Sequence, residues 1–200
     1  MAITDGYCTL AEVKAALRLS DSVDDTLLEN SIEGASRRID GYCGRFFYQR
    51  TATVLTNPRN EYVCYLPDDV ATTSGLIIRG DTSGGGTYST TYTLNTDYFL
   101  DPLDATLQSR PFRRALMRGG ATFPLYFPPA PPTVQITATF GWPAIPDDVR
   151  EACILLSMRQ FARLNAALGV VGFADMAITV RAVDPDVRDM LNHYKIIGAI

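Results

Sequence analysis

The sequence predicts an α+β fold, in which a mainly helical body, made by N- and C-terminal helices packed together, carries an inserted β-rich subdomain. Near both ends of the chain, apolar residues recur at helical intervals of three and four. Between the ends, short runs of β-branched and aromatic residues alternate with proline and glycine, as in strands and turns. We expect residues 1–50 to form the N-terminal helical part, residues 51–140 the β-rich insertion, and residues 141–200 the C-terminal helices and tail.

Two helices are expected before residue 50. Thr9 and Glu12 have the spacing of a capping box, in which each side chain bonds to the backbone of the other residue. This first helix should end near Leu19. Asp24 and Asp25 open a second, longer helix with negative charge, which the helix dipole favours. The apolar face of the second helix consists of Leu28, Ile32, Ala35, Ile39 and Cys43.

The middle of the chain has the pattern of several short strands. Residues 133–140 give the clearest strand, because Val134, Ile136 and Ala138 alternate onto one face. Five prolines between residues 123 and 132 favour a rigid loop or a sheet edge, since proline lacks the amide hydrogen that a ladder requires. The other expected strands are residues 51–56, 62–66, 76–79 and 92–94.

A long helix is expected at residues 146–167, which begin with proline and two acids and are then apolar almost all round. A helix with this pattern should be buried on every side, against its own domain and against a neighbouring subunit. We expect Leu155, Met158 and Phe161 at that subunit interface.

A last helix should begin at Asp184 and Pro185, after a flexible loop at residues 168–176. Residues 195–200, which follow it, are strongly apolar. The expected apolar face of this helix consists of Val187, Met190, Leu191 and Tyr194.

Composition and charge argue against several classes of protein. The 200 residues are 46% hydrophobic and 20% charged, as in folded proteins that need neither disulfides nor metal to form a core. A net charge of −4 argues against sequence-specific DNA binding. The only histidine is His193 and the four cysteines lack paired spacing, so we expect buried, reduced thiols, no structural zinc and no cofactor. We also expect a soluble protein without a membrane helix or secretory signal.

Two glycine motifs have a functional and a plainer interpretation. The Ser-Gly-Gly-Gly segment at residues 83–86 could bind phosphate, but no helix with a lysine follows it, which favours a hairpin turn. Arg79, Gly80 and Asp81 match an adhesion tripeptide, but a turn at the end of a strand is the simpler interpretation.

The charged residues also leave alternatives open. The acidic residues of the insertion do not follow the pattern of a calcium loop, and we interpret them as solvated carboxylates: Asp68, Asp69, Asp97, Asp101 and Asp104. Two groups of arginines could lie at the solvated surface or contact an acidic partner or phosphates: Arg37, Arg38, Arg45 and Arg50, and Arg110, Arg113, Arg114 and Arg118. Without a suitable histidine the common nucleophilic triads have no base, whereas hydrolysis by two carboxylates stays open.

Both helical ends contain motifs of one viral protein family. The segment TLAEVKAALRLSDSVDDTLLENSIEGASRRIDGYCGRFF resembles the opening of the gp6-like phage head–tail connectors. FGWPAIPDDVREACILLSMRQF and VDPDVRDMLNHYK resemble their later strand–helix element and closing helix. The middle of the chain is similar only to longer members with a β-rich insertion. The matching N-terminal positions are Thr9, Leu10, Glu12, Lys14, Leu17, Arg18, Asp24, Asp25, Tyr42, Gly44, Arg45 and Phe46.

The resemblance implies a structural virion protein with no active site. It implies a ring of about twelve identical subunits at the virion neck, between the portal protein and a tail-side stopper or head-closure protein. DNA would pass through the ring without sequence specificity, no membrane would be involved, and the protein would be made in the host cytoplasm. The portal contact would lie in the C-terminal segment, at Tyr194, Ile196, Ile197 and Ile200.

Two other functions stay open at this point. A tail-completion or adhesion module would bind through the loops of the insertion, between residues 80 and 132. A small hydrolase would depend on a pair of carboxylates.

Overall fold

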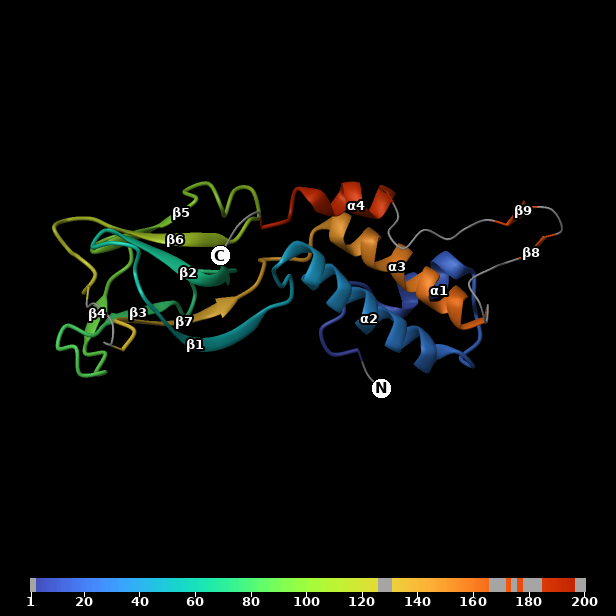
Figure 1. The fold of residues 1–200 in the computed structure, drawn as a ribbon, viewed down its shortest axis with the longest axis horizontal. Coiled ribbons are helices and arrows are strands. Elements are labelled where there is room, and N and C mark those ends of the chain that lie inside the picture. Colours follow the sequence, from blue (N-terminus) through green and yellow to red (C-terminus); the bar gives the residue numbers. More distant parts are fainter. Residues whose placement is uncertain (1–2, 126–130, 166–171, 174–175, 178–184, 197–200) are drawn as a thin grey trace. The chain divides into compact units, whose positions relative to one another are not determined.

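The computed structural model describes residues 3–125, 131–165, 172–173, 176–177 and 185–196. The chain divides into two compact units (Figure 1). The helical unit comprises Met1–Arg45 and Ile145–Ile200, and the sheet unit comprises Phe46–Ala144.

The helical unit contains α1 (Leu10–Leu17), α2 (Asp25–Cys43), α3 (Asp147–Asn165) and α4 (Pro185–Asn192). The expected capping box of α1 is confirmed. The Thr9 hydroxyl accepts a bond from the Glu12 amide at 3.2 Å, and the Glu12 carboxylate accepts one from the Thr9 amide at 2.7 Å. The Glu12 carboxylate also accepts a bond from the Thr9 hydroxyl at 2.8 Å, and the two bonds that it accepts from Thr9, led by the one from the amide, lower the pKa of Glu12. Part of the expected loop at 168–176 forms a two-stranded sheet, β8 (Gly172–Phe173) with β9 (Met176–Ala177).

The core of the helical unit lies mainly between α2 and α3. The apolar face expected for α2 is buried in full, from Leu28 to Cys43. Facing it, α3 contributes Val149, Ala152 and Cys153, each fully buried. The spacing of three and four residues in α2 thus puts all its predicted core residues on one buried face of the helix.

The sheet unit is a seven-stranded antiparallel sheet, and β7 lies near its middle. The strand order is β4-β3-β7-β2-β6-β5, and β1 pairs with the other edge of β7. β1 and β7 run in register from Arg50 opposite Phe140 to Thr56 opposite Val134. The strands are β1 (Arg50–Thr56), β2 (Val63–Val70), β3 (Ile77–Gly80), β4 (Thr90–Tyr92), β5 (Tyr98–Asp101), β6 (Phe112–Met117) and β7 (Val134–Phe140).

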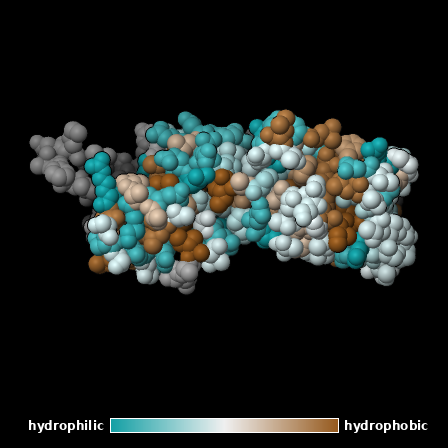
Figure 2. All heavy atoms as spheres, turned by 180° about the vertical axis from the view of Figure 1, so that it is seen from behind, coloured by the Kyte–Doolittle hydropathy of each residue, from teal (hydrophilic) through white to brown (hydrophobic). Residues whose placement is uncertain are grey.

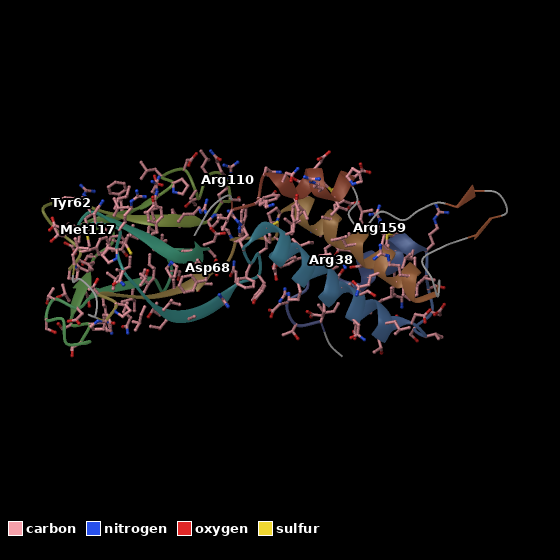
Figure 3. The ribbon with its side chains drawn as sticks, viewed as in Figure 1. Arg38, Tyr62, Asp68, Arg110, Met117 and Arg159 are labelled. Carbon is pink, nitrogen blue, oxygen red and sulfur yellow. The ribbon has the colours of Figure 1, made fainter. Side chains whose placement is uncertain are left out.

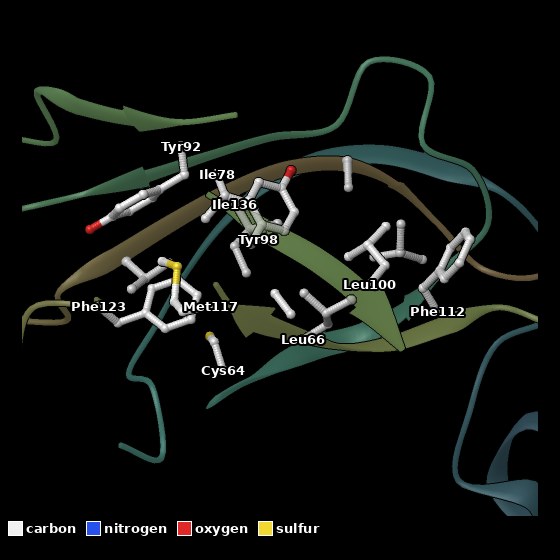
Figure 4. Packing of buried hydrophobic residues seen from close by; sticks show 14 of the residues in the cluster. Cys64, Leu66, Ile78, Tyr92, Tyr98, Leu100, Phe112, Met117, Phe123 and Ile136 are labelled. Atoms are coloured by element: carbon white, nitrogen blue, oxygen red, sulfur yellow. The ribbon is translucent and has the colours of Figure 1, made fainter. Parts of the chain in front are cut away.

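The sheet unit has a hydrophobic core of its own (Figure 4). Alternate residues of β7 point into it, and Tyr92 packs edge-on against Phe123 with ring centroids 5.6 Å apart. The buried cluster comprises Cys64, Leu66, Val70, Ile78, Tyr92, Tyr98, Leu100, Ala105, Phe112, Ala115, Met117, Phe123, Val134, Ile136, Ala138 and Phe140.

The predicted fold class, a mainly helical body with an inserted β-rich subdomain, is therefore wrong. The fold is mixed: the described residues form four helices and a seven-stranded sheet, and the strands of that sheet dominate the core. Pro58 and the turn at residues 83–86 lie in connections of that sheet, whereas Pro67 lies within β2 itself. The sequence pattern also missed β5 and β6, because β6 contains the adjacent charges of Arg113 and Arg114.

Candidate interaction surfaces

The described residues contain no grouping of His, Cys, Asp and Glu that could hold a metal ion. His193 Nε2 lies 3.5 Å from Asp148 Oδ2, but both side chains are more than half exposed. An ion pair in that setting is weakened by solvent. In the part of the chain that the structure describes, no helix combines the length and the apolar character needed to cross a bilayer.

All four cysteines are buried free thiols, as the sequence predicts. Burial raises the pKa of the Cys64 thiol to about 12 and that of Cys43 to about 11. The sulfur atoms of Cys8 and Cys153 lie 3.3 Å apart in the core of the helical unit. Burial and high pKa keep Cys43 and Cys64 unreactive, because the thiolate is the nucleophile.

The glycine-rich turn at residues 83–86 holds an internal carboxylate. Asp81 accepts hydrogen bonds from the amides of Ser83, Gly84 and Gly86, and from the Ser83 hydroxyl. These bonds, led by the one from the hydroxyl, lower the pKa of Asp81. Three of the amides that could have bound a phosphate therefore already bind Asp81, and the fourth, from Gly85, donates to the Ser83 hydroxyl at 3.2 Å. The turn interpretation is confirmed.

Several acidic residues interpreted as solvated have structural partners instead. Asp69 is buried and accepts a hydrogen bond from the indole of Trp142 at 3.2 Å, with Arg113 at 3.5 Å. Asp101 pairs with Arg114 at 2.7 Å. These carboxylates belong to β2 and β5, so their place in the sheet explains them without a calcium site or a hydrolytic pair.

Most of the arginines in the two basic segments have partners as well. Arg37 pairs with Asp40 at 2.9 Å, Arg50 pairs with Asp68 at 3.1 Å, and Arg45 is buried. Arg38 differs from them: it projects from α2 (Figure 3) and has no ion-pair or hydrogen-bond partner among the described residues.

Helix α3 is buried on one face only. Phe161, expected at a subunit interface, is 8% exposed and packs within its own unit. The other two expected interface residues, Leu155 and Met158, are half-buried, as is Ile154. These three lie one turn or less apart and form a partly exposed apolar strip. Their contact with a second subunit stays a prediction.

A small apolar hollow of about 70 Å³ opens between α2, α3 and α4. Small-molecule sites enclose roughly 300–1,000 Å³, so this hollow suits a single side chain rather than a ligand. The Tyr42 hydroxyl donates to Asn192 Oδ1 at 2.5 Å and so ties α4 to α2 beside the hollow. The residues around it are Arg38, Ile39, Tyr42, Leu156, Val187, Arg188 and Leu191, which we call the basic hollow.

The expected portal-docking residues lie partly within the described chain. The Ile196 amide donates to the Cys43 carbonyl at 2.9 Å, so the chain is tied to the end of α2 as far as Ile196. The Tyr194 hydroxyl donates to Asp148 at 3.4 Å. Ile197 and Ile200 lie outside the described residues, and the portal contact stays a prediction.

Some exposed apolar residues were not singled out by sequence reasoning. Figure 2 shows hydrophobic residues in several separate groups among hydrophilic ones. Leu103 and Leu107, in the loop between β5 and β6, are 77% and 88% exposed. Val23 and Leu27, at the start of α2, are 87% and 42% exposed. Val23 and Leu103 share a signal in the sequence, because each is a single apolar residue between aspartates of a turn segment.

The N-terminal third of the chain matches a known protein family. The model of the family described as "Phage gp6-like head-tail connector protein" matches residues 7–73, which contain α1, α2, β1 and β2. The resemblance seen in the sequence is thereby confirmed. No curated protein matches the chain.

Solved structures of gene transfer agent (GTA) particles share the fold over the full chain. A chain of the neck of an empty GTA particle is 22% identical, with a TM-score of 0.58, and the match covers 100% of this chain and 95% of that one. A chain of the neck of a native GTA particle, computed with C12 symmetry, is 23% identical with a TM-score of 0.57 and coverage of 100% and 94%. A chain of the virion of the native GTA particle is 22% identical, with a TM-score of 0.58, and the match covers 100% of this chain and 95% of that one. The sheet unit is thus part of a shared fold.

Proposed function

We propose that this protein is a structural connector subunit of the neck, where head and tail join, in a tailed phage or a gene transfer agent particle. The observation that carries the proposal is the match of residues 7–73 to the gp6-like head–tail connectors. The likeness of the full chain to chains of GTA necks supports it. The task is mechanical and needs no catalytic residue.

The proposed working form is a closed ring of about twelve copies, located in the virion between the portal and a tail-side protein. The similar neck chain in a C12-symmetric assembly supports this form. In such a ring each subunit uses one surface toward the preceding copy and a different surface toward the next.

DNA passing through the ring should contact it weakly and without sequence preference. The net charge of −4 supports this, because tight binding to DNA depends on many unpaired cations that neutralise phosphates. Several arginines of the basic segments, among them Arg50, Arg113 and Arg114, already pair with carboxylates of the sheet unit.

We place the portal contact at the end of the chain that follows α4. The bond from the Ile196 amide to the Cys43 carbonyl holds Ile196 at the end of α2, and residues 197–200 follow it in the sequence. Deleting those four residues keeps that bond, so the isolated protein should keep its melting temperature and lose binding to the portal. A large fall in melting temperature would contradict this placement.

Deletion of the gene tests the proposed function as a whole. A connector is needed after DNA packaging, so deletion should yield filled heads without tails, and a plasmid copy of the gene should restore tailed particles. Tailed, DNA-transferring particles made without the gene would contradict the proposal.

A further inference from the structure

The basic hollow combines an apolar floor with two positive charges. Ile39, Leu156 and Val187 are among its lining residues, and Arg38 and Arg188 lie beside them. Within the described part of the chain, neither guanidinium has an ion-pair or hydrogen-bond partner. An occupant that matches it therefore needs a small apolar side chain flanked by carboxylates.

The start of α2 offers those groups on the surface of the same unit. Val23 is 87% exposed and Leu27, four residues later, is 42% exposed. Asp21 and Asp24 flank Val23, and neither has an ion-pair partner among the described residues. Asp24 is the N-cap of α2, yet its side chain makes no capping bond. We call Asp21, Val23, Asp24 and Leu27 the acidic knob.

The two surfaces lie at opposite ends of one rigid helix. Leu27 and Ile39 are separated along α2 by twelve residues, a rise of about 18 Å at 1.5 Å per residue. The acidic knob therefore cannot enter the hollow of its own chain. When the knob of one copy fills the hollow of another, one copy keeps a free hollow and the other keeps a free knob. Such a head-to-tail contact adds further copies and forms a closed ring when the rotation between copies closes.

We propose that the acidic knob of one copy docks in the basic hollow of the next, with Val23 in the apolar floor and Asp21 and Asp24 facing Arg38 and Arg188. This inference rests on the proposed function, because it names the contact between neighbouring copies of the ring. The acidic carboxylates and the arginines would also orient the approaching subunits, since opposite charges steer association.

Cross-linking between two full-length variants tests the contact directly. Chains carrying Val23→Cys are mixed at high concentration with chains carrying Gly41→Cys and treated with a short bis-maleimide. Gly41 is on α2 beside Tyr42, and a Cβ there meets no atom within 4 Å. The four native cysteines are buried, so the new thiols react first. A covalent dimer should form in this mixture but not when Arg118→Cys replaces Gly41→Cys.

Charge reversal supplies a second readout of the same cross-link. Asp21→Lys with Asp24→Lys, or Arg38→Glu with Arg188→Glu, should each lower its yield about tenfold or more, since facing like charges repel. Combining the reversed knob with the reversed hollow should restore it. The matched control Arg79→Glu with Arg118→Glu, in the sheet unit, should leave the yield unchanged.

No cross-link above the Arg118→Cys level, or no restoration by the combined reversal, would overturn the inference. A stronger cross-link from Leu107→Cys to Gly41→Cys would overturn it too, by assigning the hollow to the β5–β6 loop. Rings that form on the portal without the Val23–Gly41 link would reject this contact and leave the proposed function standing. The gene-deletion phenotype tests that function separately.

Discussion

The two units of the molecule differ in where their polar groups find partners. In the sheet unit, Asp69, Asp81 and Asp101 are each satisfied by the sheet or its turns. In the helical unit, Arg38 and Arg188 stay without partners in the described residues beside an apolar hollow, and α3 keeps a partly exposed strip. The difference teaches that these carboxylates of the sheet unit serve its own structure, whereas the two arginines beside the hollow of the helical unit are available to another chain.

The largest effect should come from the core of the sheet unit. Phe123 is 1% exposed, so Phe123→Ala should cost about 3–5 kcal/mol of that unit's stability through lost burial and a cavity. Hydrogen exchange should show faster exchange in β2 and β6, with α2 and α3 protected as before. Leu107→Ala, at an 88% exposed position, is the control and should change stability by less than about 0.5 kcal/mol. Equal loss of protection in both units would contradict separate cores.

Two substitutions in α3, one in the core and one on the partly exposed strip, should differ nearly as much in their cost in stability. Phe161→Glu places a charge in the core of the helical unit. It should lower the free energy of unfolding, measured by urea denaturation, by about 3 kcal/mol or more. Met158→Glu, on the half-buried strip, should cost about 1 kcal/mol or less and yet prevent rings from forming on the portal. Normal rings from the Met158 variant would remove this strip from the subunit interface.

Removing the buried carboxylate of Asp69 should lower the stability of the sheet unit moderately. Asp69→Ala leaves the Trp142 indole N–H without the carboxylate that it bonds, and a buried donor without a partner costs about 1–3 kcal/mol. Thermal denaturation followed by tryptophan fluorescence reports on it, because Trp142 is the only tryptophan. The exposed Asp104→Ala variant serves as the comparison. Equal melting temperatures for the two variants would show that the bond does not stabilise the sheet.

The smallest effect should appear in acid, at Asp81. Its hydrogen bonds hold the pKa of this carboxyl below the unfolded value of about 3.9. The resulting stability is present above that unfolded pKa and is lost as the pH falls through the lower folded pKa. Asp81→Asn should thus be less stable than the wild type at neutral pH, and the gap should narrow in acid. A gap that is independent of pH would contradict the role of the charge.

The helices could be predicted well from the sequence because their determinants are local. Thr9 and Glu12 form the cap expected from their spacing, and the α2 face from Leu28 to Cys43 is buried as its periodicity predicts. Strand β7 also follows from its alternation.

The features that the sequence did not predict depend on contacts between segments that are distant along the chain. Strand β6 was missed because Arg113 and Arg114 resemble loop charges until Asp69 and Asp101 are brought beside them by β2 and β5. The basic hollow needs three helices in place, and no spacing along one of them predicts it.

Electron microscopy of the full-length protein assembled on its own portal tests the central claim most directly. For the proposed connector we expect closed rings of identical subunits stacked on the portal, with about twelve copies around an open channel. Single copies scattered on the portal, or no binding at saturating protein, would contradict it.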